Sequence, residues 1–262
     1  MRRAWALMAA VACCAALARA APLDPEVAIA SSRAAIGSMP GDFTFTDTSG
    51  RRVTLAGFRG RPLVVSFVYT GCSQVCPTTT RFLSKAVREA RQVVGPEAFD
   101  VVSIGFNVPA DNPVSMKVFA RQNGIDDPRW AFVVPDAAAT PAIAQAFGFS
   151  FAASAGGFDH LTQVTILDAS GRIRAQLQGE SFALPMLVQP LRELSLGQPL
   201  TGVASAAALV DRVRLLCTVY DPLSGKYRLD YALFIEMLAG VIVLGGTAAF
   251  LVRERLRARG AS

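Results

Sequence analysis

The feature that most constrains the fold is a β-branched apolar run that leads into two cysteines and then into an amphipathic helix. Residues 62–68 (PLVVSFV) have the composition of a strand that is buried on both faces. Residues 78–94 repeat apolar side chains at helical spacing and end at Gly-Pro. A second apolar run at 99–107 and a second helical pattern at 113–123 follow. The order strand, helix, strand, helix predicts a βαβ unit with a parallel sheet.

The remaining patterns extend this unit on both sides. The chain has no internal repeat. The predicted elements are a hairpin at 42–47 and 52–55, a strand at 130–134, a helix at 140–147, a glycine- and alanine-rich loop at 148–158, a hairpin at 161–167 and 172–178, and a closing helix at 183–193. This order predicts an α/β fold of the thioredoxin-like class.

Most of the positive charge lies at the two ends of the chain. The net charge is +6 at pH 7. Arg2, Arg3 and Arg19 lie in the first 20 residues of the sequence, which contain no acidic residue. Residues 253–259 add four arginines against Glu254. Because the part between the ends is close to neutral, the charge distribution disfavours nucleic acid as a partner.

The first residues have the pattern of a secretory signal peptide. Two arginines precede an apolar run from Ala4 to Leu17, and Ala18 and Ala20 form an A-x-A cleavage pattern. An uncleaved anchor is the alternative, but the run is shorter than the roughly 20 apolar residues that a membrane span needs. We therefore expect export, with cleavage after Ala20.

The other end of the chain carries a longer apolar stretch. Residues 232–252 contain a single charge, Glu236, and four arginines follow at once. Length and composition predict a transmembrane helix, and the positive-inside rule predicts a cytoplasmic C-terminus. The sequence therefore predicts a bacterial inner-membrane protein with one C-terminal span and its folded domain in the periplasm.

The predicted organisation has six parts. They are a signal peptide (1–20), a linker (21–37), a thioredoxin-like domain (38–195), a juxtamembrane segment (196–231) that is helical over 204–219, a transmembrane helix (232–252) and a cytoplasmic tail (253–262).

Cleavage of the signal peptide leaves three cysteines, Cys72, Cys76 and Cys217, so at least one thiol is unpaired or binds something. Cys72 and Cys76 stand at the start of a predicted helix, where unpaired N–H groups and the helix dipole stabilise a thiolate. The spacing permits a disulfide and equally permits two ligands to one ion. Spacing alone therefore leaves both possibilities open.

The only histidine, His160, follows Asp159 at the junction between the glycine-rich loop and the next predicted strand. In a thioredoxin-like domain this loop lies over the helix that carries the cysteines. Two thiolates and one imidazole suit copper, since thiolate favours Cu(I) and imidazole accommodates Cu(II). Zinc would need a fourth ligand, which no nearby residue type supplies.

Several motifs strongly resemble the Sco/SenC family of membrane-anchored copper proteins over residues 38–195. They are Phe67-Val68-Tyr69-Thr70-Gly71-Cys72, Cys76-Pro77, Asp159-His160 and Asp168-x-x-Gly171. The resemblance implies a thioredoxin-like fold and copper bound by Cys72, Cys76 and His160. It also implies copper delivery to, or reduction of cysteines in, the binuclear copper site of cytochrome c oxidase, with the copper-bearing subunit as partner.

The sequence departs from the family pattern in two ways, in the loop after the second strand and in the place of the membrane anchor. Asn107 stands where an acid is expected, and Ala110 stands where an arginine is expected. The predicted anchor is C-terminal, whereas the familiar anchor of the family is N-terminal. Both departures leave the three predicted ligands intact.

The remaining sulfur-bearing residues have simpler interpretations. We interpret Cys217 as a small apolar residue of the juxtamembrane helix, with a copper-relay thiol as the alternative. Met39, Met116 and Met186 are scattered, so we expect each to pack in the core.

Two functional hypotheses remain. In the first, the protein is a metallochaperone that holds copper through Cys72, Cys76 and His160 and passes it on. In the second, it is a periplasmic thiol-disulfide oxidoreductase, in which Cys72 attacks and Cys76 resolves, acting on oxidase-subunit cysteines or on other periplasmic thiol-redox or copper proteins. A structural disulfide ranks lower, because so small a ring constrains the unfolded chain little.

Overall fold

The computed structural model describes residues 23–154, 156–197, 218–221, 226–229 and 232–259. The chain divides into two compact units. One comprises Met1–Lys85 and Phe99–Ala183, and the other comprises Ala86–Ala98 and Leu184–Ser262. The predicted signal peptide and Cys217 lie outside the described residues, as does most of the predicted juxtamembrane helix.

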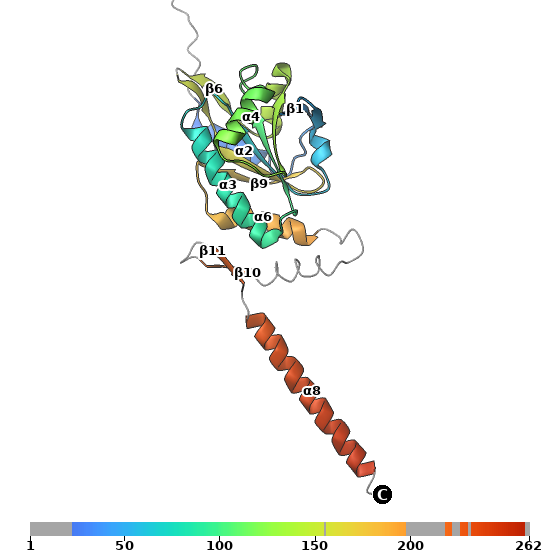
Figure 1. Ribbon diagram of the computed structural model, residues 1–262. Helices are drawn as coiled ribbons and strands as arrows, with labels where there is room; N and C mark the ends of the chain where they lie inside the picture. The colour runs from blue at the N-terminus through green and yellow to red at the C-terminus, as the bar shows by residue number, and fades with distance from the viewer. Residues whose placement is uncertain (1–22, 155, 198–217, 222–225, 230–231, 260–262) are drawn as a thin grey trace, which may run out of the picture. The chain divides into compact units, whose positions relative to one another are not determined.

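The first unit is built on a seven-stranded sheet of order β2-β1-β5-β4-β3-β8-β9 (Figure 1). β4 pairs in parallel with both β3 and β5, whereas β8 is antiparallel to β3 and to β9. This arrangement confirms the predicted α/β class and parallel unit. The strands are β1 (Thr44–Asp47), β2 (Arg52–Thr54), β3 (Leu63–Val68), β4 (Asp100–Gly105), β5 (Trp130–Pro135), β8 (Gln163–Leu167) and β9 (Ile173–Gln178).

β3 lies inside the sheet, and all six of its residues are buried. Its one polar side chain is satisfied within the sheet, because Ser66 Oγ lies 2.9 Å from Ser103 Oγ of β4. Trp130 of β5 donates its indole N–H to the same Ser103 oxygen at 2.9 Å. Three neighbouring strands thus share one buried polar cluster without an unpaired group.

The helices that follow β3 and β4 begin close to their predicted positions. α3 (Val75–Val94) buries the predicted stripe of Leu83, Val87, Ala90 and Val94. α4 (Pro113–Gln122) starts with a capping box between Asn112 and Ser115 and packs against β5. The first unit also contains α5 (Thr140–Ala146) and the 3-10 turns η1 (Leu55–Phe58) and η2 (Ala137–Ala139).

The segment that the sequence suggested as a linker contains a helix, α2 (Pro25–Ala34). Asp24 caps its first turn, and α2 lies against β9. Ser32 is fully buried and accepts a hydrogen bond of 3.1 Å from the Gln178 side chain. The signal was weak because α2 buries only Ala28 and Ser32, which are small residues that hydropathy patterns do not detect.

The glycine- and alanine-rich segment, expected as a loop, forms a second small sheet. β6 (Phe151–Ser154) and β7 (Gly157–His160) pair as an antiparallel hairpin, seen at one end of the unit in Figure 1. Its strands carry alanine and glycine, which have low strand propensity, so local sequence gave no strand signal. Tertiary packing of Phe151 and Phe158 against Phe106 stabilises the hairpin instead.

The second unit contains α6 (Leu184–Gly197), the hairpin of β10 (Thr218–Asp221) and β11 (Lys226–Leu229), and α8 (Ala232–Arg259). The hairpin was not predicted. Eight large apolar side chains of α8 are more than half exposed, namely Ile235, Leu238, Val241, Ile242, Val243, Leu244, Phe250 and Leu251. Among the described residues, no helix is both long enough and apolar enough to cross a membrane.

Gly148 provides a test of the packing of α2. It has a φ of +61°, and an added Cβ would lie 2.5 Å from the Ser31 carbonyl oxygen and 2.9 Å from Ser32 Cα. We expect Gly148→Ala to lower the free energy of unfolding by about 2–4 kcal/mol, the sum of backbone strain and overpacking. Urea unfolding followed by Trp130 fluorescence measures this loss.

Gly50→Ala is the matched control. Gly50 also has a positive φ, +85°, but an added Cβ meets nothing within 4 Å. We expect only the backbone cost of about 1–2 kcal/mol there. Equal losses in the two variants would show that α2 does not pack tightly on Gly148.

Candidate metal and thiol site

The end of β3 positions both cysteines. The strand ends at Val68, a turn of six residues follows, and α3 begins at Val75. Cys76 therefore lies in the first turn of the helix, and Cys72 lies just before it. The helix begins three residues earlier than predicted, and Pro77 is compatible with this start because first-turn N–H groups have no helical partner.

Cys72 is a free, partly exposed thiol that caps the helix. Its Sγ accepts a hydrogen bond of 3.3 Å from the Cys76 N–H, one of the unpaired donors of the first turn. Burial alone would raise the pKa of Cys72. Hydrogen bonds from the N–H groups of Cys76 and Gln74 and from the Tyr69 hydroxyl outweigh it, so the pKa lies below its usual value.

Cys76 is free as well, but only 1% of its surface is exposed. Burial raises the pKa of its thiol to about 12, and the neighbouring Cys72 and Asp111 charges act in the same direction. A hydrogen bond from the Tyr69 N–H opposes this shift only in part. The two cysteines therefore differ: Cys72 favours the thiolate, and Cys76 favours the neutral thiol.

His160 ends β7 and faces Cys76, with its Nε2 atom 3.9 Å from Cys76 Sγ. Its Nδ1 lies 3.4 Å from the Leu161 carbonyl oxygen, which can only accept a hydrogen bond, so the lone pair is on Nε2. Burial lowers the pKa of His160, despite the opposing effects of the Leu161 carbonyl and Asp159. The imidazole is therefore neutral at physiological pH and presents a free nitrogen to Cys76.

Tyr69 connects the parts of this site, a role that the sequence analysis missed. Its hydroxyl donates to Cys72 and accepts a hydrogen bond from the Phe158 N–H of β7. A Cβ added to Gly157, whose φ is +130°, would lie 2.9 Å from that hydroxyl. Aromatic rings also surround His160: those of Tyr69, Phe106 and Phe149 have centroids within 6.0 Å of its ring.

Asp111 is the second residue that the sequence analysis missed. It is 1% exposed and accepts hydrogen bonds from the Thr70 N–H, the Thr70 hydroxyl and the Asn107 N–H at 2.7, 2.7 and 2.8 Å. Asn107, which stands where an acid was expected, contributes its backbone to this network. The contact between Thr70 and Asp111 joins segments 41 residues apart, so only the fold could show it.

The structure brings the three predicted ligands together pairwise. Cys72 contacts Cys76, and Cys76 contacts His160 across 84 residues of sequence. In the described part of the chain, no group of three or more His, Cys, Asp or Glu side chains is arranged to hold a metal ion. The joint ligand set of Cys72, Cys76 and His160 therefore stays a prediction.

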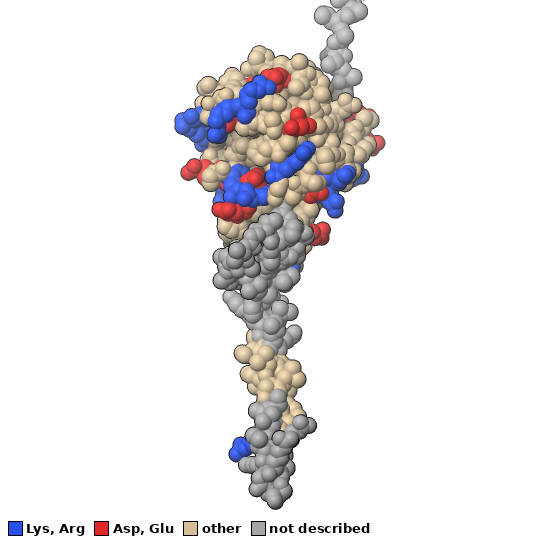
Figure 2. Space-filling view, turned by 90° about the vertical axis from the view of Figure 1, so that its right-hand side faces the viewer, with Lys and Arg blue, Asp and Glu red and all other residues tan. Residues whose placement is uncertain are grey.

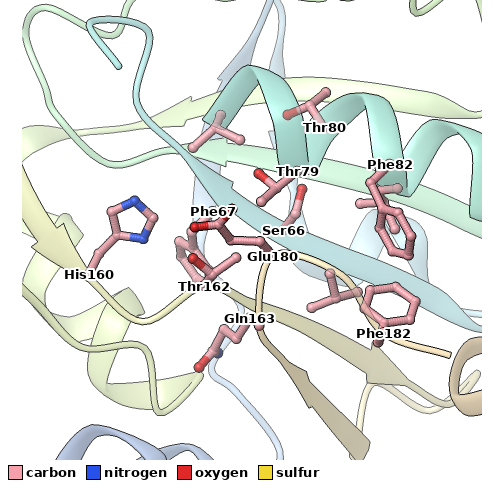
Figure 3. A pocket seen from close by; sticks show the side chains of 14 residues that line it. Ser66, Phe67, Thr79, Thr80, Phe82, His160, Thr162, Gln163, Glu180 and Phe182 are labelled. Atoms are coloured by element: carbon pink, nitrogen blue, oxygen red, sulfur yellow. The ribbon is translucent and has the colours of Figure 1, made fainter. Parts of the chain in front are cut away.

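The cavity beside His160 is small, about 20 Å³, which is room for a water molecule but not for an organic substrate. Figure 3 shows His160 at one end of this cavity and the rings of Phe82 and Phe182 at the other. These two rings meet edge to face with centroids 4.9 Å apart. His160 lines this cavity but neither cysteine does, so the cavity lies beside the thiol pair and does not contain it.

Other surfaces of the first unit offer less chemistry. An open groove of about 580 Å³ near the end of α2 is lined by Ser31, Ala34, Ala35, Ser38, Met39, Gln145, Ala146, Gly148, Phe149 and Ser150. On the face of the molecule that Figure 2 shows, acidic and basic side chains are interspersed.

The three methionines named in the sequence analysis differ in burial. Met116 is buried as expected, but Met39 and Met186 are about half exposed, so the expectation that they pack in the core was wrong.

Comparison with known proteins gives consistent matches. A family model described as SCO1/SenC matches residues 32–194. A SCO1 protein homolog of Bacillus subtilis is 28% identical over 93 residues, which are 35% of this chain and 46% of that protein. The chain thus spans about half the length of this curated relative.

Solved structures share the fold. Bradyrhizobium japonicum ScoI, solved with copper bound, is 21% identical with a TM-score of 0.50, covering 60% of this chain and 99% of that one. BsSco, described as a member of the Sco family of cytochrome c oxidase assembly proteins and as having a disulfide switch, is 16% identical with a TM-score of 0.56. It covers 62% of this chain and 96% of that one. These likenesses support the predicted thioredoxin-like fold.

The contrast between the two cysteines predicts selective alkylation. We expect iodoacetamide to modify Cys72 first and from a lower pH, because its thiolate forms more readily and it is partly exposed. Cys76, buried and with a pKa raised to about 12, should react only at high pH or after unfolding. Peptide mapping by mass spectrometry after timed alkylation at several pH values measures both rates.

Tyr69→Phe removes the hydroxyl that donates to Cys72. We expect it to move the alkylation profile of Cys72 toward higher pH. Thr79→Val serves as control, since the Thr79 hydroxyl donates only to the Val75 and Cys76 carbonyls. A Cys76 that reacts as fast as Cys72 in the folded protein would contradict this description of the site.

Proposed function

Because the chain belongs to the SCO1/SenC family, we propose that it is a copper-binding protein that takes part in the assembly of cytochrome c oxidase. In this proposal, copper is the cargo. Cys72, Cys76 and His160 hold it, and the copper-bearing subunit of the oxidase receives it.

The observation that carries the proposal is the approach of the His160 imidazole to the Cys76 thiol, at 3.9 Å. A neutral imidazole with a free nitrogen beside a cysteine pair is a donor set that prefers copper among the common metals. Cys72, the partly exposed member, is suited to be the exchangeable ligand. Cys76 and His160 are suited to be the retained ones.

The relatives compared above support the same proposed function. ScoI of Bradyrhizobium japonicum binds copper in its structure, and BsSco is described with the oxidase assembly proteins. Both are distant in sequence, so they support the fold and suggest the cargo and the target. Copper and the oxidase partner are therefore proposals for this chain.

A second candidate function is thiol-disulfide exchange, favoured by the difference between the two cysteines. Cys72 has the lowered pKa that an attacking thiol needs, whereas Cys76 is the buried partner. In this hypothesis the Cys72 thiolate attacks a target disulfide and releases one target thiolate. Cys76 then displaces the second target thiol and forms the Cys72–Cys76 disulfide, so the target gains two electrons.

We also propose that the apolar segment 232–252 anchors the protein in a bacterial inner membrane, with the domain in the periplasm. Val241, Ile242, Val243 and Leu244 are consecutive and each more than 60% exposed, so they point around most of the helix circumference. Water is an unfavourable environment for such a helix, whereas lipid is a favourable one. The proposal rests on the sequence of the whole segment together with this exposure.

Copper titration distinguishes the two candidate functions. We expect the reduced full-length protein to bind Cu(I), and His160→Ala to weaken copper binding at least roughly tenfold, because a ligand matters more than its supporting contacts. Competition with a chromophoric Cu(I) chelator measures the affinity. His160→Ala should still reduce a disulfide substrate, since both cysteines remain.

Asp136→Asn is the control, because it neutralises an exposed carboxylate that pairs with Arg52 and leaves the imidazole and both thiols in place. Unchanged copper affinity in His160→Ala, together with retained disulfide reduction, would leave only the oxidoreductase hypothesis. Loss of copper binding in Cys72→Ser and in Cys76→Ser is expected under the metal hypothesis.

Membrane topology is tested separately. A reporter fused after Ser262 should be active only when it is of a kind that functions in the cytoplasm. A chain that stops before residue 232 should leave the membrane fraction. Activity of a periplasm-specific reporter at Ser262 would overturn the proposed orientation.

A further inference from the structure

We infer that Asp111 is a positioning residue for the cysteine pair: its buried carboxylate fixes Thr70, and with it the turn that carries Cys72. The inference deepens the proposed function and rests on it only in treating Cys72 and Cys76 as the working pair. The described contacts include no hydrogen bond from Asp111 to either thiol. Besides the effect of its charge on Cys76, Asp111 therefore acts through the backbone of the turn.

The contacts of Asp111 tie together the ends of two parallel strands. One carboxylate oxygen accepts from both the N–H and the hydroxyl of Thr70, each at 2.7 Å. The other oxygen accepts from the Asn107 N–H at 2.8 Å, and the Asp111 N–H donates back to the Asn107 carbonyl at 2.8 Å. Thr70, two residues after the end of β3, and Asn107, two residues after the end of β4, are thereby held against one buried group.

Thr70, the residue that Asp111 holds, lies in the same tight turn as Cys72. The Cys72 N–H donates to the Tyr69 carbonyl at 3.2 Å, so Thr70 lies inside the turn. With both its backbone and its side chain bound, Thr70 cannot rotate without breaking two hydrogen bonds to a carboxylate, which are stronger than neutral ones. The turn therefore holds Cys72 Sγ at the Cys76 N–H, where the two atoms are 3.3 Å apart.

Asp111 also packs closely against Gly105 at the end of β4. A Cβ added to Gly105 would lie 2.9 Å from the Asp111 Cβ, 3.0 Å from Met116 Sδ and 3.2 Å from a Val134 methyl group. Met116 is itself fully buried. Asp111 is therefore packed closely against the backbone at the end of β4, which favours the observed geometry of its hydrogen bonds to Thr70.

A turn whose conformation is fixed by the Thr70–Asp111 hydrogen bonds favours every reaction that uses both sulfur atoms at once. When the Cys72 turn is already ordered, closing a disulfide or binding one ion costs less conformational entropy. Loss of these hydrogen bonds should make the Cys72–Cys76 disulfide less favourable, whether or not a metal is present. Disulfide equilibrium therefore reports on the inference without copper.

The test compares Asp111→Asn with Asp47→Asn in the full-length protein. Asp47 is a matched control because it is also buried and also accepts from neighbouring N–H groups and a serine hydroxyl, at a turn between β1 and β2. Each protein is equilibrated with mixtures of reduced glutathione and glutathione disulfide. The two thiols lose two electrons and two protons as the Cys72–Cys76 bond forms, and one glutathione disulfide becomes two glutathione molecules.

We expect Asp111→Asn to make disulfide formation roughly tenfold less favourable, since one carboxylate oxygen is replaced by an amide NH2 group, which donates and cannot accept from these donors. Asp47→Asn should stay within about twofold of wild type, although it destabilises the fold. Trapping with an alkylating reagent and mapping the Cys72 peptide gives the oxidised fraction. If Asp111→Asn does not fold, Thr70→Val replaces it, because it removes only the hydroxyl bond, and we expect a loss of roughly threefold; Thr70→Ser should match wild type.

Equal equilibrium constants for Asp111→Asn and Asp47→Asn would overturn the inference. An unchanged constant in Thr70→Val would overturn it as well, because this variant keeps the Asp111 charge and removes only a hydrogen bond to it. Failure of the wild-type pair to form a disulfide would also overturn it. If the disulfide equilibrium shifts as expected but the wild type does not bind Cu(I), the inference stands and the copper proposal fails.

Discussion

Everything at the site depends on the burial of β3 between β4 and β8. A strand with partners on both edges and all six residues buried cannot shift its register without exposing its apolar side chains. Its carboxyl end is therefore a fixed point in the fold. The Cys72 turn and the first turn of α3 start from that point. The parallel β4 ends at the same edge, and the antiparallel β8 begins there. Asp111, in the segment after β4, and His160, at the end of β7 just before β8, therefore both lie near the cysteines.

The sequence was sufficient for the parts of the fold that are set by local periodicity. The β-branched run of β3 and the helical stripe of α3 are patterns within twenty residues, and both were predicted closely. The contributions of Tyr69 and Asp111 could not be seen in this way, because their partners lie 89 and 41 residues away. Phe158 offers a backbone N–H, which is the same for any residue type except proline. The only signal for Asp111 was a polar residue just after a buried strand, at a place where loops are usually polar.

The differences between prediction and structure have a common physical cause. α2 and the β6–β7 hairpin are built from small residues such as Ala28, Ser32, Ala153 and Gly157, which carry little hydropathy signal. Their order comes from close approach of backbones and from aromatic packing, as at Gly148 and Phe106. Such contacts depend on the finished tertiary structure. The hairpin matters most, because it carries His160 to Cys76.

The unequal surroundings of the two cysteines also connect the two candidate functions. An incoming thiol or ion must meet Cys72 first, because Cys76 is 1% exposed. For electron transfer this makes Cys72 the attacking sulfur and Cys76 the resolving one. For metal transfer the same asymmetry leaves Cys76 and His160 as an inner pair, while Cys72 is the ligand that can be exchanged with a recipient. A disulfide between the cysteines removes both sulfur atoms as metal donors, so under the copper proposal the pair must be reduced before it can accept the ion. If the pair holds copper as proposed, its redox state therefore controls metal binding even if the protein reduces no other protein.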